Sequence, residues 1–199
     1  MGKAVILKNS TLGVAAAGDE SHTLDIKRSK VELYGGTFRN YTLSGDFAAV
    51  HWDRELLGGD VINGLMYGCK VEGRTNEIGI DIDGAQYIWI ERCVISANAG
   101  CGILIAGGQL GNPVETVVRD CYFRGNTVDI MLGQANFTLI EDCKFVDDAS
   151  DDYVLTSDVS GRTGACSDTA VVNCAMNTSS VNNQLHTGVK YMGTKIQDY

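Results

Sequence analysis

The hexapeptide IERCVI, residues 90–95, decides the fold because similar hexapeptides recur along the chain. Each consists of an apolar residue, two mostly polar residues, a cysteine, any residue and a second apolar residue. The cysteines of successive copies are 24, 28, 22 and 31 residues apart. Repetition at about 20–30 residues is typical of a solenoid. The five copies are MYGCKV (66–71), IERCVI (90–95), VRDCYF (118–123), IEDCKF (140–145) and VVNCAM (171–176), and LYGGTF (33–38) is a further copy with Gly36 in the cysteine position.

Between the hexapeptides, apolar residues alternate with polar or small ones, which indicates β-strands. Within the hexapeptide, Ile90 and Cys93 both face inward although they are three residues apart, so the chain must bend at Glu91–Arg92. Each repeat is therefore predicted to contain about three short strands with corners between them. The alternation in IGIDIDG (78–84), GILIAGG (102–108) and VDIMLG (128–133) places one set of apolar residues on one face: Ile78, Ile80, Ile82, Ile103, Ile105, Val128, Ile130 and Leu132.

These features predict an all-β fold, a single-stranded right-handed parallel β-helix of about seven turns stacked at about 4.8 Å. Residues 31–176 are expected to form the helix, residues 1–30 an N-terminal cap or first turn, and residues 177–199 a C-terminal cap or extension. Asn98 and Asn126, each five residues after a cysteine, are predicted at tight corners because asparagine tolerates left-handed backbone, with Asp148 in the equivalent place.

The cysteines are interpreted as core residues, because a buried thiol packs as a small hydrophobic group and is unreactive. The chain has seven cysteines, an odd number, and no CxxC motif. Cys101 and Cys166 lie outside the repeated position and are also expected in the core. The predicted interior ladder of cysteine and isoleucine contains Cys69, Cys93, Cys121, Cys143 and Cys174.

Composition excludes several classes of protein. The formal net charge is −9, which argues against a nucleic-acid partner because such a protein needs a basic face. The longest apolar runs are too short to span a membrane. The first ten residues contain an apolar run of only four, too short for a signal peptide, so we expect synthesis in a host cytoplasm without secretion.

No catalytic residue and no cofactor are expected. FVDDASDDY (145–153) could bind calcium or supply paired acids for glycoside cleavage, but we favour a solvated acidic loop. The histidines His22, His51 and His186 carry no motif, and His51 is expected at the surface or at a corner. The candidates for a metal site are therefore only the four aspartates of that loop, Asp147, Asp148, Asp151 and Asp152.

Outward side chains suggest contacts between turns and with partners. Charged residues beside the cysteines should form pairs between neighbouring turns: Glu91, Arg92, Arg119, Asp120, Glu141 and Asp142. Aromatic residues on one lateral face are interpreted as a protein interface, with a carbohydrate-stacking surface as the alternative. The interface candidates are Tyr87, Trp89 and Tyr122, together with Tyr199 at the C-terminus.

Over about residues 31–176, the repeated hexapeptide resembles the pectate-lyase-like superfamily of right-handed β-helices. That superfamily includes polysaccharide lyases and hydrolases, phage tailspikes, and trimeric cement (decoration) proteins of phage capsids. The motifs of its polygalacturonase-like enzymes are incomplete here, since NTV (126–128) lacks the aspartate of Asn-Thr-Asp and no RIK is present. The resemblance implies a non-enzymatic virion protein, a homotrimer bound to the major capsid protein of a bacteriophage. The alternatives are a tailspike or glycan-cleaving enzyme, and a carbohydrate-binding module.

Overall fold

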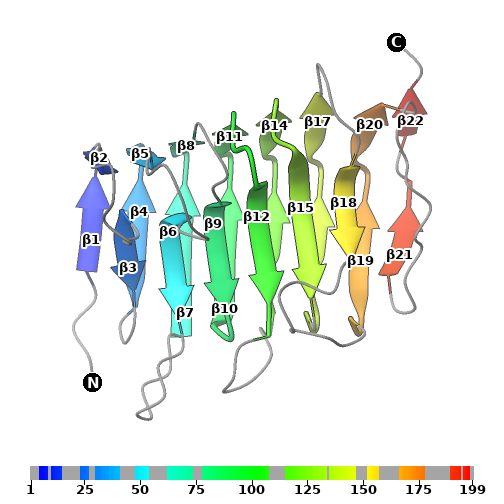
Figure 1. Ribbon diagram of the computed structural model, residues 1–199. Helices are drawn as coiled ribbons and strands as arrows, with labels where there is room; N and C mark the ends of the chain where they lie inside the picture. The colour runs from blue at the N-terminus through cyan, green and yellow to red at the C-terminus, as the bar shows by residue number, and fades with distance from the viewer. Residues whose placement is uncertain are drawn as a thin grey trace.

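The computed structural model describes residues 5–8, 10–14, 23–26, 30–40, 48–53, 62–73, 78–107, 115–133, 135–146, 152–156, 166–177, 189–193 and 195–197. These residues form strands and the corners between them, with no helix in any described range. Except at the C-terminal end, consecutive described strands enter three sheets in turn, so the chain winds as a β-solenoid (Figure 1). The predicted all-β parallel fold is confirmed.

Three parallel sheets, here called A, B and C, form the sides of the solenoid. Sheet A contains β1 (Val5–Lys8), β4 (Val31–Tyr34), β7 (Ile62–Tyr67), β10 (Gln86–Glu91), β13 (Val117–Arg119), β16 (Leu139–Glu141), β19 (Thr169–Val172) and β21 (Val189–Met192). Sheet B contains β2 (Thr11–Val14), β5 (Thr37–Asn40), β8 (Lys70–Glu72), β11 (Val94–Ser96), β14 (Tyr122–Arg124), β17 (Lys144–Val146), β20 (Ala175–Asn177) and β22 (Lys195–Gln197). Sheet C contains β3 (Leu24–Ile26), β6 (Ala48–Asp53), β9 (Ile78–Asp83), β12 (Cys101–Ala106), β15 (Val128–Gly133) and β18 (Asp152–Thr156).

The predicted count of about seven turns is not supported. Sheets A and B have eight strands each, whereas sheet C has six. About four turns, from β7 to β18, combine three strands with a cysteine at the corner between sheets A and B. The hexapeptides suggested more turns because the first copy has Gly36 in place of the cysteine, and the last copy, in β19 and β20, is followed by no described strand of sheet C. The division of the chain at residues 30 and 176 stays a prediction.

Many of the described corners turn on a residue in left-handed backbone conformation. The bend predicted beside Cys93 is confirmed at Arg92, whose φ is 52°. At the corner between sheets B and C, the left-handed residues are Ala97 and Gly125, each directly before the predicted asparagine. The predicted corner positions are therefore right, but Asn98 and Asn126 do not themselves adopt the left-handed conformation. The other left-handed residues that precede a ladder cysteine are Gly68, Asp120, Asp142 and Asn173.

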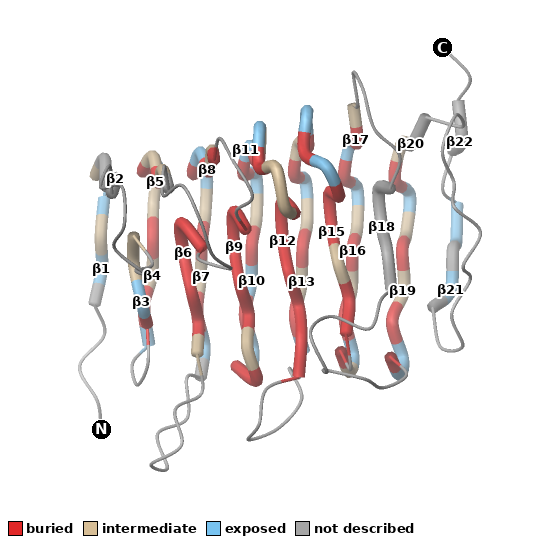
Figure 2. Tube along the Cα trace, viewed as in Figure 1, coloured by how far each residue is buried: buried red, intermediate tan, exposed pale blue. Residues whose placement is uncertain are grey.

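The interior of the solenoid is one continuous apolar core. Strand residues facing inward from all three sheets are buried, as the red segments of the tube show (Figure 2). In sheet B, for example, Phe123 and Phe145 stack on neighbouring turns with ring centroids 4.8 Å apart. Of the eight residues predicted on one face of sheet C, Ile78 and Val128 instead belong to a second, separate cluster with Leu104.

Sheet C differs from the other two because its outer face is also buried. In β6, β9 and β12, the buried residues are consecutive, whereas in β10 they alternate with exposed ones. A parallel strand covered on both faces is expected to bury consecutive residues in this way. The outer face of sheet C is therefore a shielded environment, and the polar groups placed there need partners.

Candidate functional site

The five cysteines of the predicted ladder lie in the apolar core. All seven cysteines are buried free thiols. The Sγ atom of Cys121 lies 3.2 Å from the carbonyl oxygen of Arg119 and 3.5 Å from that of Ile90 on the previous turn. Cys93 and Cys143 make the same pair of contacts. These carbonyl oxygens accept hydrogen bonds from the thiols and so fix each thiol inside its corner.

The pKa values alternate along the ladder because each thiol shares hydrogen bonds with its neighbours. Hydrogen bonds from the thiols of Cys143 and Cys93 lower the pKa of Cys121, and the pKa values of Cys69 and Cys174 are lowered in the same way. Hydrogen bonds with the thiols of Cys121 and Cys69, together with burial, raise the pKa of Cys93. Hydrogen bonds with Cys121 and Cys174, together with burial, raise the pKa of Cys143. All five thiols are buried in the apolar core, where they pack as small apolar side chains.

The corner between sheets B and C holds a network of buried amides. The Asn126 side chain donates to the Ile95 carbonyl oxygen at 3.1 Å and to the Asp129 carboxylate at 2.8 Å. Its Oδ1 accepts from the backbone N–H of Asn98 at 3.1 Å and from the Asn98 side chain at 2.8 Å. Gly102 makes room beside this network, since a Cβ there would lie 2.6 Å from the Asp129 carbonyl oxygen. The network links neighbouring turns.

Five of the six charged residues predicted beside the cysteines form ion pairs between neighbouring turns. Arg119 lies between Glu91 and Glu141 in the strand register. Its guanidinium is 2.8 Å from the Glu141 carboxylate and 3.8 Å from that of Glu91. At the corner that follows these strands, the Nε atom of Arg92 is 3.7 Å from the Asp120 carboxylate. These pairs between partly or fully exposed side chains link neighbouring turns.

The aromatic interface candidates do not share one face. Tyr87 and Trp89 lie in β10 of sheet A and are 36% and 43% exposed. Tyr122 lies in β14 of sheet B, where the Lys144 ammonium is 5.9 Å from its ring centroid. Tyr199 lies outside the described residues. The prediction of a single aromatic face is wrong because a corner follows Arg119 and turns Tyr122 onto the next side.

Trp89 instead belongs to a row of apolar residues on the outside of sheet A. The register places one residue of the row on each of five successive strands, from β7 to β19. All five are exposed or partly exposed. We call this row the sheet A stripe, and its members are Leu65, Trp89, Val117, Leu139 and Ala170.

The four aspartates proposed as metal candidates are not placed by the structure. Asp147, Asp148 and Asp151 lie outside the described residues, as do His22 and His186. Only the backbone of Asp152, the first residue of β18, is described. The hypothesis of a calcium or acid pair in this loop therefore stays untested.

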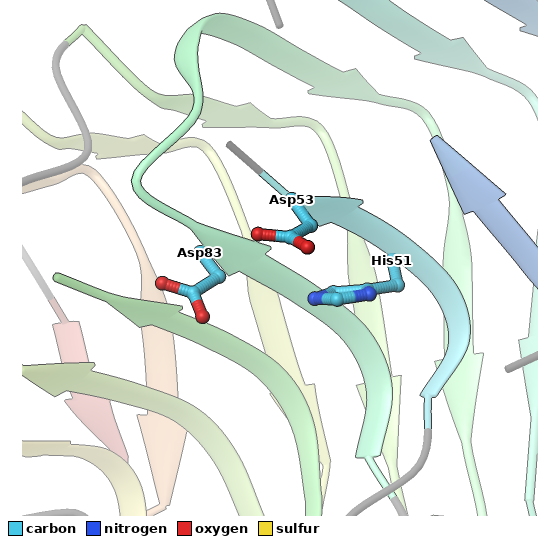
Figure 3. Close-up of side chains that lie close together, drawn as sticks. All are labelled: His51, Asp53 and Asp83. Atoms are coloured by element: carbon cyan, nitrogen blue, oxygen red, sulfur yellow. The ribbon is translucent and has the colours of Figure 1, made fainter. Parts of the chain in front are cut away.

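A second cluster, absent from the sequence prediction, lies on the shielded outer face of sheet C. His51 and Asp53 come from β6, and Asp83 comes from the next strand, β9. One ligand atom from each of the three lies within 4.8 Å of the other two. The imidazole ring points toward the two carboxylates (Figure 3). We call these three residues the sheet C cluster.

Two further carboxylates flank His51 in the strand register. Asp25 of β3 lies opposite His51 on one side, and Asp81 of β9 lies opposite it on the other. The Nδ1 atom of His51 is 3.2 Å from the Asp25 carboxylate, and Nε2 is 3.7 Å from that of Asp81. His51 is 8% exposed and Asp81 is 4% exposed. The expectation that His51 lies at the surface or at a corner is wrong, because the outer face of sheet C is itself buried.

Apolar residues border the cluster on the side of β12. Leu104 lies opposite Asp81, and Ala106 lies opposite Asp83, and both apolar residues are buried. Charges are stabilised less by solvent in such surroundings, so their mutual interactions are strong. An imidazole and two carboxylates in this arrangement can share a proton or bind a metal ion.

The sequence contained a weak signal for this cluster. HWD (51–53) and DID (81–83) each place two polar side chains on one face of a strand. Nothing in either triplet shows that the two strands pair in the register that brings Asp53 opposite Asp83.

Comparison with family models identifies the chain. Residues 66–196, about two thirds of the sequence, match the model described as "Right handed beta helix region". The chain belongs to this family. The right-handed parallel β-helix is thereby established, and the match begins at the first cysteine hexapeptide. Comparison with curated proteins and with solved structures found no match.

Membership of this family does not determine the function, since the β-helix fold occurs in enzymes and in non-enzymes. Among the described residues, no helix is long and apolar enough to cross a membrane. The function must therefore be inferred from the surfaces of this chain.

Proposed function

We propose that the chain is a non-enzymatic structural protein of a virus particle, a decoration protein that binds a bacteriophage capsid as a homotrimer. The observation that carries the proposal is the sheet A stripe. The stripe is a row of five apolar residues, of which Trp89 is 43% exposed. Such a row is typical of a surface that another protein covers.

The shape of the stripe favours a second copy of the same chain as the partner. Five parallel strands at about 4.8 Å spacing extend the row over about 19 Å on one side of a straight solenoid. Three copies arranged around a threefold axis would each bury this side and leave no open interface. The capsid as the second partner rests on the resemblance of the repeat to trimeric cement proteins.

The assembly is tested by native mass spectrometry and light scattering of the purified protein. The wild type is expected to be a trimer. Trp89→Lys should dissociate it because a buried ammonium in the stripe would lose its hydration. Val94→Lys is the matched control, since Val94 is 38% exposed but lies on sheet B, and this variant should remain trimeric. A monomeric wild type, or a trimeric Trp89→Lys variant, would show that the stripe is not the interface.

The capsid partner and the absence of an enzyme are tested separately. The trimer should co-sediment with phage particles from the source of the sequence, and Trp89→Lys should reduce that binding. Incubation of the trimer with acidic polysaccharides should produce no new reducing ends and no unsaturated sugars. Turnover in that assay would instead support the tailspike or glycan-cleaving alternative.

A further inference from the structure

The sheet C cluster has the composition and placement of a metal site. It combines one imidazole and two carboxylates from two neighbouring turns of the solenoid. The three ligand atoms lie within 4.8 Å of one another. Small rotations of the side chains would bring all three within the roughly 2.0–2.2 Å at which nitrogen and oxygen ligands bind a metal such as zinc.

The contact between Asp25 and His51 determines which imidazole nitrogen is available. With Asp25 3.2 Å from Nδ1, the proton of a neutral ring is held on Nδ1. The lone pair then lies on Nε2, the ring atom that faces the aspartates of β9. A carboxylate that orients a histidine from behind in this way is a common feature of metal sites. Asp25 is therefore a positioning residue for His51.

The register of sheet C adds an electrostatic reason for a cation. Asp53 and Asp83 lie directly opposite each other on neighbouring strands, an arrangement that destabilises a sheet when both are charged. With Asp25 and Asp81, the group contains four carboxylates and one imidazole, which carry together −4 with a neutral ring. Leu104 and Ala106 reduce solvation on the side of β12. A divalent ion bound by both Asp53 and Asp83 would offset the repulsion between their carboxylates.

We propose that His51, Asp53 and Asp83 bind one divalent transition-metal ion, with Asp25 positioning the imidazole. Mixed nitrogen and oxygen ligands favour ions such as Zn²⁺, Mn²⁺ and Co²⁺, whereas Ca²⁺ and Mg²⁺ prefer oxygen alone. The ion links β6 to β9 and so stabilises the N-terminal turns of the solenoid. This site is independent of the sheet A stripe and of the trimer.

The proposal is tested on the full chain after dialysis against a chelator. Titration calorimetry with Zn²⁺ should show one site per chain, and the melting temperature should rise with Zn²⁺ but much less with Ca²⁺. Binding of Co²⁺ should give a visible spectrum with nitrogen and oxygen ligands and without a thiolate charge-transfer band. Such a band would place the metal on the cysteines and overturn the proposal, as would the absence of a saturable site.

Variants distinguish Zn²⁺ binding by the sheet C cluster from non-specific binding to other carboxylates of the chain. Asp83→Asn should weaken Zn²⁺ binding at least about tenfold, and Asp25→Asn should weaken it by about 10- to 100-fold, the usual effect of losing a carboxylate behind a ligating histidine. Asp142→Asn is the matched control, because this exposed corner carboxylate should leave Zn²⁺ binding unchanged. Equal affinity of Asp83→Asn and the wild type would overturn the assignment of ligands. Measurement on Trp89→Lys should give the wild-type affinity, so that failure of the trimer and failure of the metal site remain distinguishable.

Discussion

The corner between sheets A and B, here called the cysteine corner, and the corner between sheets B and C, the asparagine corner, differ in the chemistry of their inward side chains. Each places a left-handed residue directly before an inward side chain, Asp120 before Cys121 and Gly125 before Asn126. The thiol makes two long contacts with carbonyl oxygens, whereas the amide makes four hydrogen bonds. The cysteine corner therefore depends mainly on size and apolarity, and the asparagine corner depends on a specific set of partners.

The largest expected effect tests whether the cysteine corner requires an apolar side chain. Cys121→Asp should lower the free energy of unfolding by about 3–5 kcal/mol, because it buries a charge with no partner of opposite sign. Burial should raise the folded-state pKa of the new carboxyl above its unfolded value of about 4. The folded state then holds the proton more tightly, so the loss should be small below about pH 4 and should grow as pH rises.

Urea unfolding of Cys121→Asp at several pH values measures this effect, with Cys121→Ala as the control. If Cys121→Asp is as stable as Cys121→Ala at pH 8, Cys121 does not face the core.

The second effect compares the two corners with the same substitution. Asn126→Ala removes the acceptor of the Asn98 backbone N–H and the donor to the Asp129 carboxylate, both of them buried. Leaving these two groups unsatisfied should cost about 2–4 kcal/mol. Cys121→Ala loses a small apolar volume and weak hydrogen bonds with two carbonyl oxygens and the neighbouring thiols, and it should cost about 1 kcal/mol.

Urea unfolding of both alanine variants under one condition gives the comparison directly. Similar costs at the two corners would mean that the amide network contributes little beyond packing.

The same contrast explains what the sequence could predict. The cysteine hexapeptide can be recognised in the sequence because each copy forms the same local structure. In each copy, a small inward side chain follows a bend at a residue such as Arg92. Asn98 and Asn126 were found by their constant distance from a cysteine, although their four hydrogen bonds were not foreseen. Features that repeat in every turn leave a signal in the sequence.

The sheet C cluster occurs only once, and so it leaves no such signal. Asp53 and Asp83 are 30 residues apart, and their alignment depends on how the chain between them, which includes residues 54–61 and 74–77, closes one turn. Alternation also predicts a solvated outer face, whereas the outer face of sheet C is buried at His51 and Leu104. The placement of Tyr122 was wrong for a related reason, since alternation was carried across a corner. Register and corner position are properties of the assembled turns.

The smallest expected effect concerns the outside of the cysteine corner. Arg119, two residues before Cys121, links Glu91 and Glu141 across three turns, and its side chain is 37% exposed. Exposed ion pairs are screened by water and salt, so Arg119→Met should lower the free energy of unfolding by less than about 1 kcal/mol. Urea is the suitable denaturant because it leaves the ionic strength unchanged, and the effect should shrink further in about 1 M NaCl, where the screening length is near 3 Å. Glu115→Gln is a suitable control, because this carboxylate is exposed at another corner. A loss from Arg119→Met that matches that of Cys121→Asp and persists in salt would show that the charges outside the corner, and not the side chains inside it, hold the turns together.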